Sequence, residues 1–138
     1  MSTVEIEGLR VSFPGERGPV VALEDFSLVL AEGEFTVLLG ESGCGKSTAL
    51  NAIAGLAKPD RGRISIGGSV VYDGAAGVLV PPNKRDLGMV FQSYALWPHL
   101  SVLENVAYPL RRRRAADAGE RALEALQRVR CEWLAERY

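Results

Sequence analysis

The sequence predicts an α/β fold, with β-strands in the first part of the chain and helices in the last part. Residues 3–13 and 20–31 alternate apolar and polar side chains, as in strands with one buried face. Residues 35–40 and 87–92 are nearly continuous apolar runs, which is typical of strands buried on both faces of a mainly parallel sheet. From about Asp117 onward, apolar residues recur at helical spacing.

Composition indicates an ordinary globular chain with room for one domain. It has 138 residues, of which 47% are hydrophobic and 24% charged, with a formal net charge of −1. Such a charge supplies no global field that would attract nucleic acid or an acidic membrane, and no nucleic-acid partner is expected. The two cysteines, Cys44 and Cys131, form no disulfide framework, which favours a reducing, cytoplasmic setting. We see no secretory signal and no apolar run of the roughly 20 residues that a membrane span needs.

Turn residues divide the first part of the chain. "PGERGP" at 14–19 separates the first two predicted strands, and "RISIGG" followed by "SVVYDG" (63–74) predicts a hairpin. Between them, "KSTALNAIAGL" (46–56) predicts a helix that Pro59 and Gly62 end. Its apolar stripe comprises Leu50, Ile53 and Ala54.

Two helices are expected in the last part of the chain. Ser101 and Glu104 have the spacing of a capping box at the start of a short helix that runs through Val106. The run Arg111 to Arg114 then precedes the helix that starts near Asp117. The apolar stripe of that helix is expected to comprise Ala122, Leu123, Leu126, Val129, Arg130, Trp133, Leu134 and Tyr138.

The strongest motif is Gly40-x-x-x-x-Gly45-Lys46-Ser47, the phosphate-binding P-loop pattern, set between a predicted strand and a predicted helix. Glycines let successive backbone N–H groups point at a polyphosphate, and the helix N-terminus adds its positive end. Lys46 offers an ammonium to the outer phosphates, the Ser47 hydroxyl a ligand to Mg²⁺, and Thr48 a phosphate contact. The candidate nucleotide-binding residues of the loop are Gly40, Glu41, Ser42, Gly43, Cys44, Gly45, Lys46, Ser47 and Thr48. The alternative, a glycine-rich turn with a chance lysine, does not account for the strand–loop–helix context.

Cys44 lies inside this loop. Oxidation of its thiol would block the entry of phosphate, so a redox switch is one interpretation. A small side chain that fits the loop is the simpler one.

Four stretches together resemble the first half of the ATP-binding subunit of an importer-type ABC transporter. They are "GESGCGKST" (40–48), "ALEDFSLVLAEGEFTVLLG" (22–40), "AIAGLAKPDRGRISIGG" (52–68) and "PPNKRDLGMVFQSYALWPHLSVLENVAYPL" (81–110). The resemblance implies a P-loop NTPase fold with a partial parallel sheet, an N-terminal antiparallel β lobe and the start of a helical subdomain. Residues 1–138 would form the N-terminal part of one ATP-binding domain, about 1–92 being the core and about 93–138 the helical part.

The resemblance also implies roles for individual residues. Lys46 would contact the β- and γ-phosphates, Ser47 would bind Mg²⁺, and Gln92 would reach the metal and sense the γ-phosphate. Gln92 ends a predicted strand at its carboxyl end, where ligands collect in open α/β sheets; a capped strand end is the structural alternative. Phe13 takes the place of an aromatic residue that stacks on adenine, although a core phenylalanine suits this position nearly as well.

As partners, the resemblance implies membrane-spanning subunits and a second ATP-binding subunit, at the cytoplasmic face of the plasma membrane. The apolar residues of the segment 93–110 would face the membrane subunits, or be buried within the domain; they are Tyr94, Leu96, Trp97 and Leu100. His99 is interpreted as a packing or interface residue, and Arg111 to Arg114 as a solvated run or a contact with lipid or partner. The expected function is ATP-driven import, with ferric iron as a first guess among iron, polyamine, sulfate, sugar and phosphonate solutes.

The parts that hydrolysis requires are missing from this sequence. No apolar strand ending in Asp and Glu follows Gln92, and Asp73 fits a hairpin turn instead. No LSGGQ-type signature follows either, and no histidine stands where the family has its switch histidine. The alternatives are therefore an inactive part of an ATPase subunit, a module that only binds nucleotide, or another P-loop phosphotransferase. An incomplete parallel sheet would also expose part of the core, which predicts poor stability or association.

Overall fold

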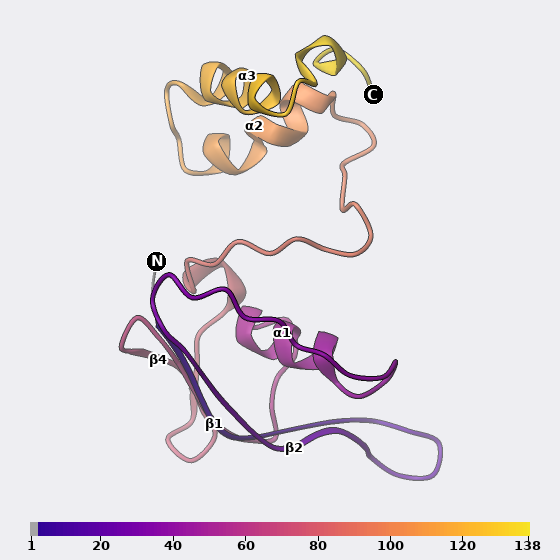
Figure 1. The fold of residues 1–138 in the computed structure, drawn as a ribbon, viewed down its shortest axis with the longest axis vertical. Coiled ribbons are helices and arrows are strands. Elements are labelled where there is room, and N and C mark those ends of the chain that lie inside the picture. Colours follow the sequence, from indigo (N-terminus) through magenta and orange to yellow (C-terminus); the bar gives the residue numbers. More distant parts are fainter. Residues whose placement is uncertain (1–2) are drawn as a thin grey trace. The chain divides into compact units, whose positions relative to one another are not determined.

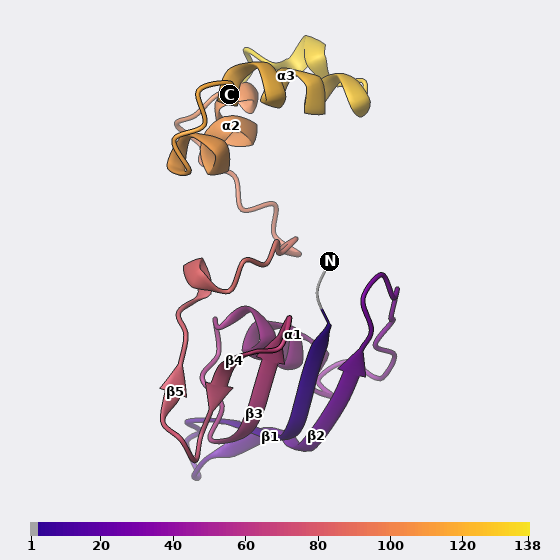
Figure 2. The same cartoon turned by 90° about the vertical axis from the view of Figure 1, so that its left-hand side faces the viewer.

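The structure is a computed structural model that describes residues 3–138, and it divides into two compact units, Met1–Met89 and Val90–Tyr138. The first unit contains an antiparallel sheet with the strand order β2-β1-β3-β4-β5 (Figures 1 and 2). Its strands are β1 (Val4–Phe13), β2 (Val20–Leu30), β3 (Arg61–Ile66), β4 (Ser69–Asp73) and β5 (Val78–Leu79). The strands expected at 3–13 and 20–31 are thus present as β1 and β2, and the hairpin expected at 63–74 is present as β3–β4.

One face of this sheet carries the core of the first unit. On β1 the buried side chains Val4, Ile6, Leu9 and Val11 follow the alternation seen in the sequence, with one step at Gly8. They pack with Ile64 of β3 and with the helix α1 (Lys46–Ala54). The buried residues of α1 are the small Ala49 and Ala52, so the helix backbone comes close to the sheet.

The structure corrects two details of α1. Leu50, expected on its apolar stripe, is 51% exposed. The helix also ends at Ala54, before the expected stop at Pro59, because Gly55 adopts φ 80° and its N–H bonds back to the carbonyls of Ala52 and Asn51.

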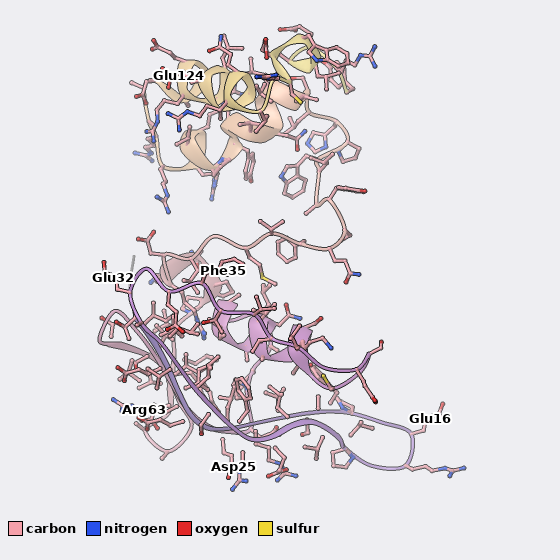
Figure 3. All side chains as sticks on the ribbon, in the orientation of Figure 1. Glu16, Asp25, Glu32, Phe35, Arg63 and Glu124 are labelled. Atoms are coloured by element: carbon pink, nitrogen blue, oxygen red, sulfur yellow. The ribbon has the colours of Figure 1, made fainter. Side chains whose placement is uncertain are left out.

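Both predicted parallel strands are wrong. Residues 35–40 and 87–92 form no ladder, and each pairing among the described residues is antiparallel. Phe35 and Leu39 are 91% and 88% exposed, and Val90 is 98% exposed. Figure 3 labels Phe35 on the segment that connects β2 to α1. A strand inside a parallel sheet needs hydrogen-bonding strands along its edges and other elements that cover its faces. The described residues supply no pairing strand to either segment.

A buried arginine fixes the end of α1 opposite the loop. Arg85 follows the short 3-10 helix η1 (Pro82–Lys84) and is only 3% exposed. Its guanidinium donates to the carbonyls of Ala52 (2.9 Å) and Ile53 (2.8 Å) at the end of α1, and to that of Val80 (2.9 Å). Burial lowers the pKa of this guanidinium. Arg85 therefore ties α1 to the segment that follows β5.

The second unit is a helical hairpin of α2 (Val102–Arg112) and α3 (Ala118–Arg128), followed by the 3-10 helix η2 (Glu132–Leu134). The capping box is confirmed: the Ser101 hydroxyl accepts from the N–H of Glu104, and the Glu104 carboxylate accepts from the N–H of Ser101. α2 runs past the predicted end at Val106.

The long helix predicted from Asp117 stops early. α3 buries Ala118, Ala122 and Leu126 and then ends at Arg128. Beyond it Arg130 has φ 58°, which turns the chain out of the helix. The remainder of the predicted stripe is therefore not one face of a helix, and its outer residues Val129, Trp133 and Tyr138 are exposed.

Candidate functional site: the loop at the start of α1

At Gly45 the backbone of the loop lies in close contact with β2. Gly45 is the N-cap of α1 with φ 93°, a conformation that side chains rarely adopt. A Cβ atom at this position would collide with the carbonyl oxygen of Ala22 and lie 2.7 Å from Cδ2 of Leu23. The site therefore needs glycine for both space and conformation. The close approach also fixes the start of α1 over the sheet.

The N-terminus of α1 is left open to an anion. No side chain caps it and no acidic residue lies in its first turn. The first amides of a helix have no carbonyl within the helix to bond, and they carry the positive end of the helix dipole. A Cβ atom built on Gly43 would meet nothing within 4 Å, so the loop faces open space there. These features fit a phosphate group.

Lys46 folds back across the loop. Its ammonium Nζ donates to the carbonyl oxygens of Gly40 (2.8 Å) and Glu41 (2.6 Å) and lies 3.3 Å from Sγ of Cys44. A positive charge is thus held at the loop by the loop's own backbone. The thiol of Cys44 also packs on Gly40, where an added Cβ would lie 2.6 Å from the sulfur.

The hydroxyl residues of the motif differ in their exposure. Ser47 is exposed and Thr48 half-buried, while Glu41 and Ser42 are exposed. Among residues 3–138 no group of three or more His, Cys, Asp or Glu side chains could hold a metal ion. A Mg²⁺ ion at this loop would therefore need oxygen ligands from a bound phosphate in addition to Ser47.

Phe13 is the last residue of β1. It pairs with Val20, while Gly45 abuts Ala22 and Leu23, a few residues further along β2. Its side chain is 45% exposed. An aromatic surface is therefore available near the loop.

Gln92 belongs to the other unit, Val90–Tyr138, and lies exposed in an irregular segment. It does not end a strand, contrary to the expectation. Its contact with Mg²⁺ and with the γ-phosphate stays a prediction.

Arg85 is the residue that sequence reasoning missed. It stands in the stretch "PPNKRD", whose prolines and charges predict a solvated loop. No signal in the sequence around Arg85 points to its burial; the close approach is visible only in the structure, where a Cβ added at Gly55 would lie 2.7 Å from Nε of Arg85. Arg85 holds the far end of the helix whose near end forms the loop.

The sequence of this chain is similar to a known family and to several known proteins. The sequence profile of the family described as ABC transporter matches residues 23–138. The trehalose/maltose import ATP-binding protein MalK of Thermococcus litoralis is 54% identical over 97 residues, which are 70% of this chain and 26% of that protein. The Fe(3+) ions import ATP-binding protein FbpC of Agrobacterium fabrum is 46% identical over 129 residues, 92% of this chain and 34% of that protein.

Solved structures show the same fold. The ATP-binding cassette MJ0796, in a dimeric post-hydrolysis state bound to ADP and Pi, matches with a TM-score of 0.77 and 30% identity. The match covers 96% of this chain and 60% of that one. The chain spans about a quarter to a third of the curated relatives named above. Among the described residues, no helix is long and apolar enough to cross a bilayer.

Proposed function

Because this chain belongs to the ABC transporter family, we propose that it binds ATP with Mg²⁺ as part of a subunit that energises import of a solute across a membrane. The observation that carries the proposal is the loop Gly40–Thr48, where an uncapped helix N-terminus and the ammonium of Lys46 meet. Both favour negative charge at one place, and a triphosphate tail supplies it.

The geometry indicates how the chain would hold the nucleotide. The free amides at the start of α1 donate to phosphate oxygens, and Gly43 leaves the room that a phosphate needs. Lys46 exchanges its bonds to the carbonyls of Gly40 and Glu41 for bonds to the outer phosphates. Since this ammonium already lies at the loop, it moves little to do so.

Three further contacts belong to this proposal. Ser47 would be a ligand of Mg²⁺, which when bound neutralises charge on the outer phosphates. Phe13, exposed at the end of β1, would stack on the adenine ring. Gln92 would reach the metal and the γ-phosphate with its neutral amide.

In the complete subunit, we propose ATP hydrolysis coupled to transport, with membrane-spanning subunits and a second ATP-binding subunit as partners, at the cytoplasmic face of the membrane. The named relatives import different solutes, trehalose/maltose and Fe(3+) ions. Solute choice therefore belongs to other subunits, and ferric iron is one candidate among several.

Titration calorimetry of the folded chain with ATP and Mg²⁺ tests the binding step. Replacing Lys46 with alanine should weaken binding about tenfold or more, because a charge-assisted bond is worth about 1.5–3 kcal/mol. Lys58→Ala removes an exposed lysine just beyond the other end of α1 and is the matched control. Absence of heat at millimolar ATP, or an equal effect of the two variants, would contradict the proposal.

A module that binds nucleotide without turnover is the second candidate. It is favoured by the site itself, because the loop Gly40–Thr48 accounts for binding of the phosphates and not for their hydrolysis. We expect phosphate release by this chain alone to stay at background. Release that Lys46→Ala abolishes would exclude the binding-only module.

A further inference from the structure

The most concentrated charge on the second unit lies at the turn between its two helices. Arg111 and Arg112 form the end of α2, and Arg113 and Arg114 continue into the turn. All four side chains are exposed. We refer to Arg111–Arg114 as the arginine turn.

The backbone at this turn would favour a different residue. The N–H of Arg114 bonds to the carbonyl of Arg111, and that of Ala115 bonds to the carbonyl of Leu110. This is the Schellman pattern, in which the residue just after the cap is left-handed and usually glycine. Arg114 has φ 57° at this position. A side chain is disfavoured there, so local backbone preference does not explain the arginine.

The carboxylates near the arginine turn, Glu104, Asp117 and Glu120, are fewer than its four arginines. The shortest contact between Arg111 and Glu104 is 3.8 Å, with both side chains partly exposed. Exposed ion pairs of this kind contribute little free energy, and salt screens them. On the facing helix, Asp117 lies 3.9 Å from Arg121, a further arginine near the turn, and Glu120 is the other acidic group of the first turn of α3. Positive charge therefore predominates at this end of the hairpin.

An aromatic side chain adjoins this charge. Tyr108 stands three residues before Arg111 and four before Arg112, which places it on the same side of α2. It is 40% exposed, and its ring centroid lies 5.7 Å from that of Trp97. Arginine beside a half-exposed aromatic ring is the combination that favours the headgroup region of a bilayer.

We propose that the arginine turn, with Tyr108 beside it, binds the surface of an anionic lipid bilayer. The choice of a bilayer over another polyanion rests on the proposed function, which brings the subunit to a membrane, and on the aromatic residue. The arginines attract the negative headgroups, and Tyr108 enters the interface. Binding should therefore weaken as salt increases, because charges separated by solvent are screened.

The chain contains a matched control for this proposal. α2 and α3 end in the same way, with arginine as the last helical residue and again at the left-handed position: Arg112 and Arg114 on α2, Arg128 and Arg130 on α3. Each double glutamine variant removes two positive charges from equivalent positions. Effects on helix dipole and turn geometry are thus equal in the two variants.

The test is sedimentation of the full chain with vesicles of phosphatidylcholine, with and without phosphatidylglycerol. We expect R112Q/R114Q to lower the partition onto anionic vesicles about 25-fold, at about fivefold per arginine, and R128Q/R130Q to lower it much less. R114G should raise the melting temperature, because glycine suits the left-handed position, and should still weaken binding to anionic vesicles. If Arg114 had only a structural role, R114G would leave vesicle binding unchanged. Equal losses in the two double variants, equal binding to vesicles without phosphatidylglycerol, or equally strong binding to duplex DNA would overturn the proposal.

ATP affinity measured on R112Q/R114Q separates this proposal from the proposed function. The arginine turn and the loop at Lys46 lie in different units. We therefore expect unchanged ATP binding in that variant. If vesicle binding fails while ATP still binds, only the bilayer proposal falls.

Discussion

Replacing Arg85 with methionine should remove a large part of the stability of the sheet unit. Methionine keeps most of the side-chain bulk and removes the donors, so the effect reports hydrogen bonding more than a cavity. Three bonds of 2.8–2.9 Å are lost, to the carbonyls of Val80, Ala52 and Ile53. At about 1–1.5 kcal/mol for each bond, the free energy of unfolding should fall by about 3–5 kcal/mol.

That loss is large beside the 5–15 kcal/mol, roughly, by which domains are stable. With a urea m-value of about 1.5 kcal/mol/M, the midpoint of unfolding should fall by about 2–3 M. Urea denaturation read by hydrogen exchange of peptides from the sheet unit measures this unit separately from the helical hairpin. Because Arg85 holds the end of α1 opposite the loop, affinity for ATP should fall as well.

Arg63→Ala is the control for loss of an arginine. Its contacts with Glu7 and Asp73 are 3.8 and 3.9 Å, and its side chain is 44% exposed, so we expect a change below about 1 kcal/mol. Arg85→Lys should fall between the two, because an ammonium lacks the planar fork. A midpoint for Arg85→Met within error of the wild type, or equal to that of Arg63→Ala, would mean that the bonds from Arg85 do not stabilise the sheet unit.

Three other substitutions test single features of the two units. Gly45→Ala should lower the melting temperature and abolish ATP binding in calorimetry, because the added Cβ collides with β2; unchanged binding would contradict the close approach. The bond from the N–H of Ser101 lowers the pKa of Glu104, so the bond stabilises the fold above the ordinary glutamate pKa and this contribution is lost as pH falls through the lowered value. The melting temperature of Glu104→Gln should therefore change less between neutral and acidic pH than that of the wild type. An unchanged dependence on pH would count against the bond. Phe35→Ser with Leu39→Ser removes two exposed apolar side chains, and light scattering should then show less association than in the wild type; a wild type that is already monomeric would show that this segment causes none.

Features that depend on neighbouring residues were predictable from the sequence. The strands β1 and β2, the hairpin β3–β4, the start of α1 after Gly45, and the capping box of Ser101 and Glu104 all occur where the pattern indicated. Their causes lie within a few residues: alternation, turn glycines and a side chain that reaches the next helical turn. The family also followed from these local motifs, since the loop is contiguous in sequence.

The chemistry that the loop Gly40–Thr48 offers can be derived from its own residues, because glycine freedom, a helix N-terminus and a lysine are local properties. Tertiary structure alone decided that residues 35–40 and 87–92 stay unpaired and that Arg85 is buried under α1. An apolar run becomes a buried strand only when other segments supply hydrogen-bonding edges and covering faces. A charged side chain becomes part of the core only when distant carbonyls converge on it. Both conditions are set by contacts between segments far apart in the chain, which no local pattern encodes.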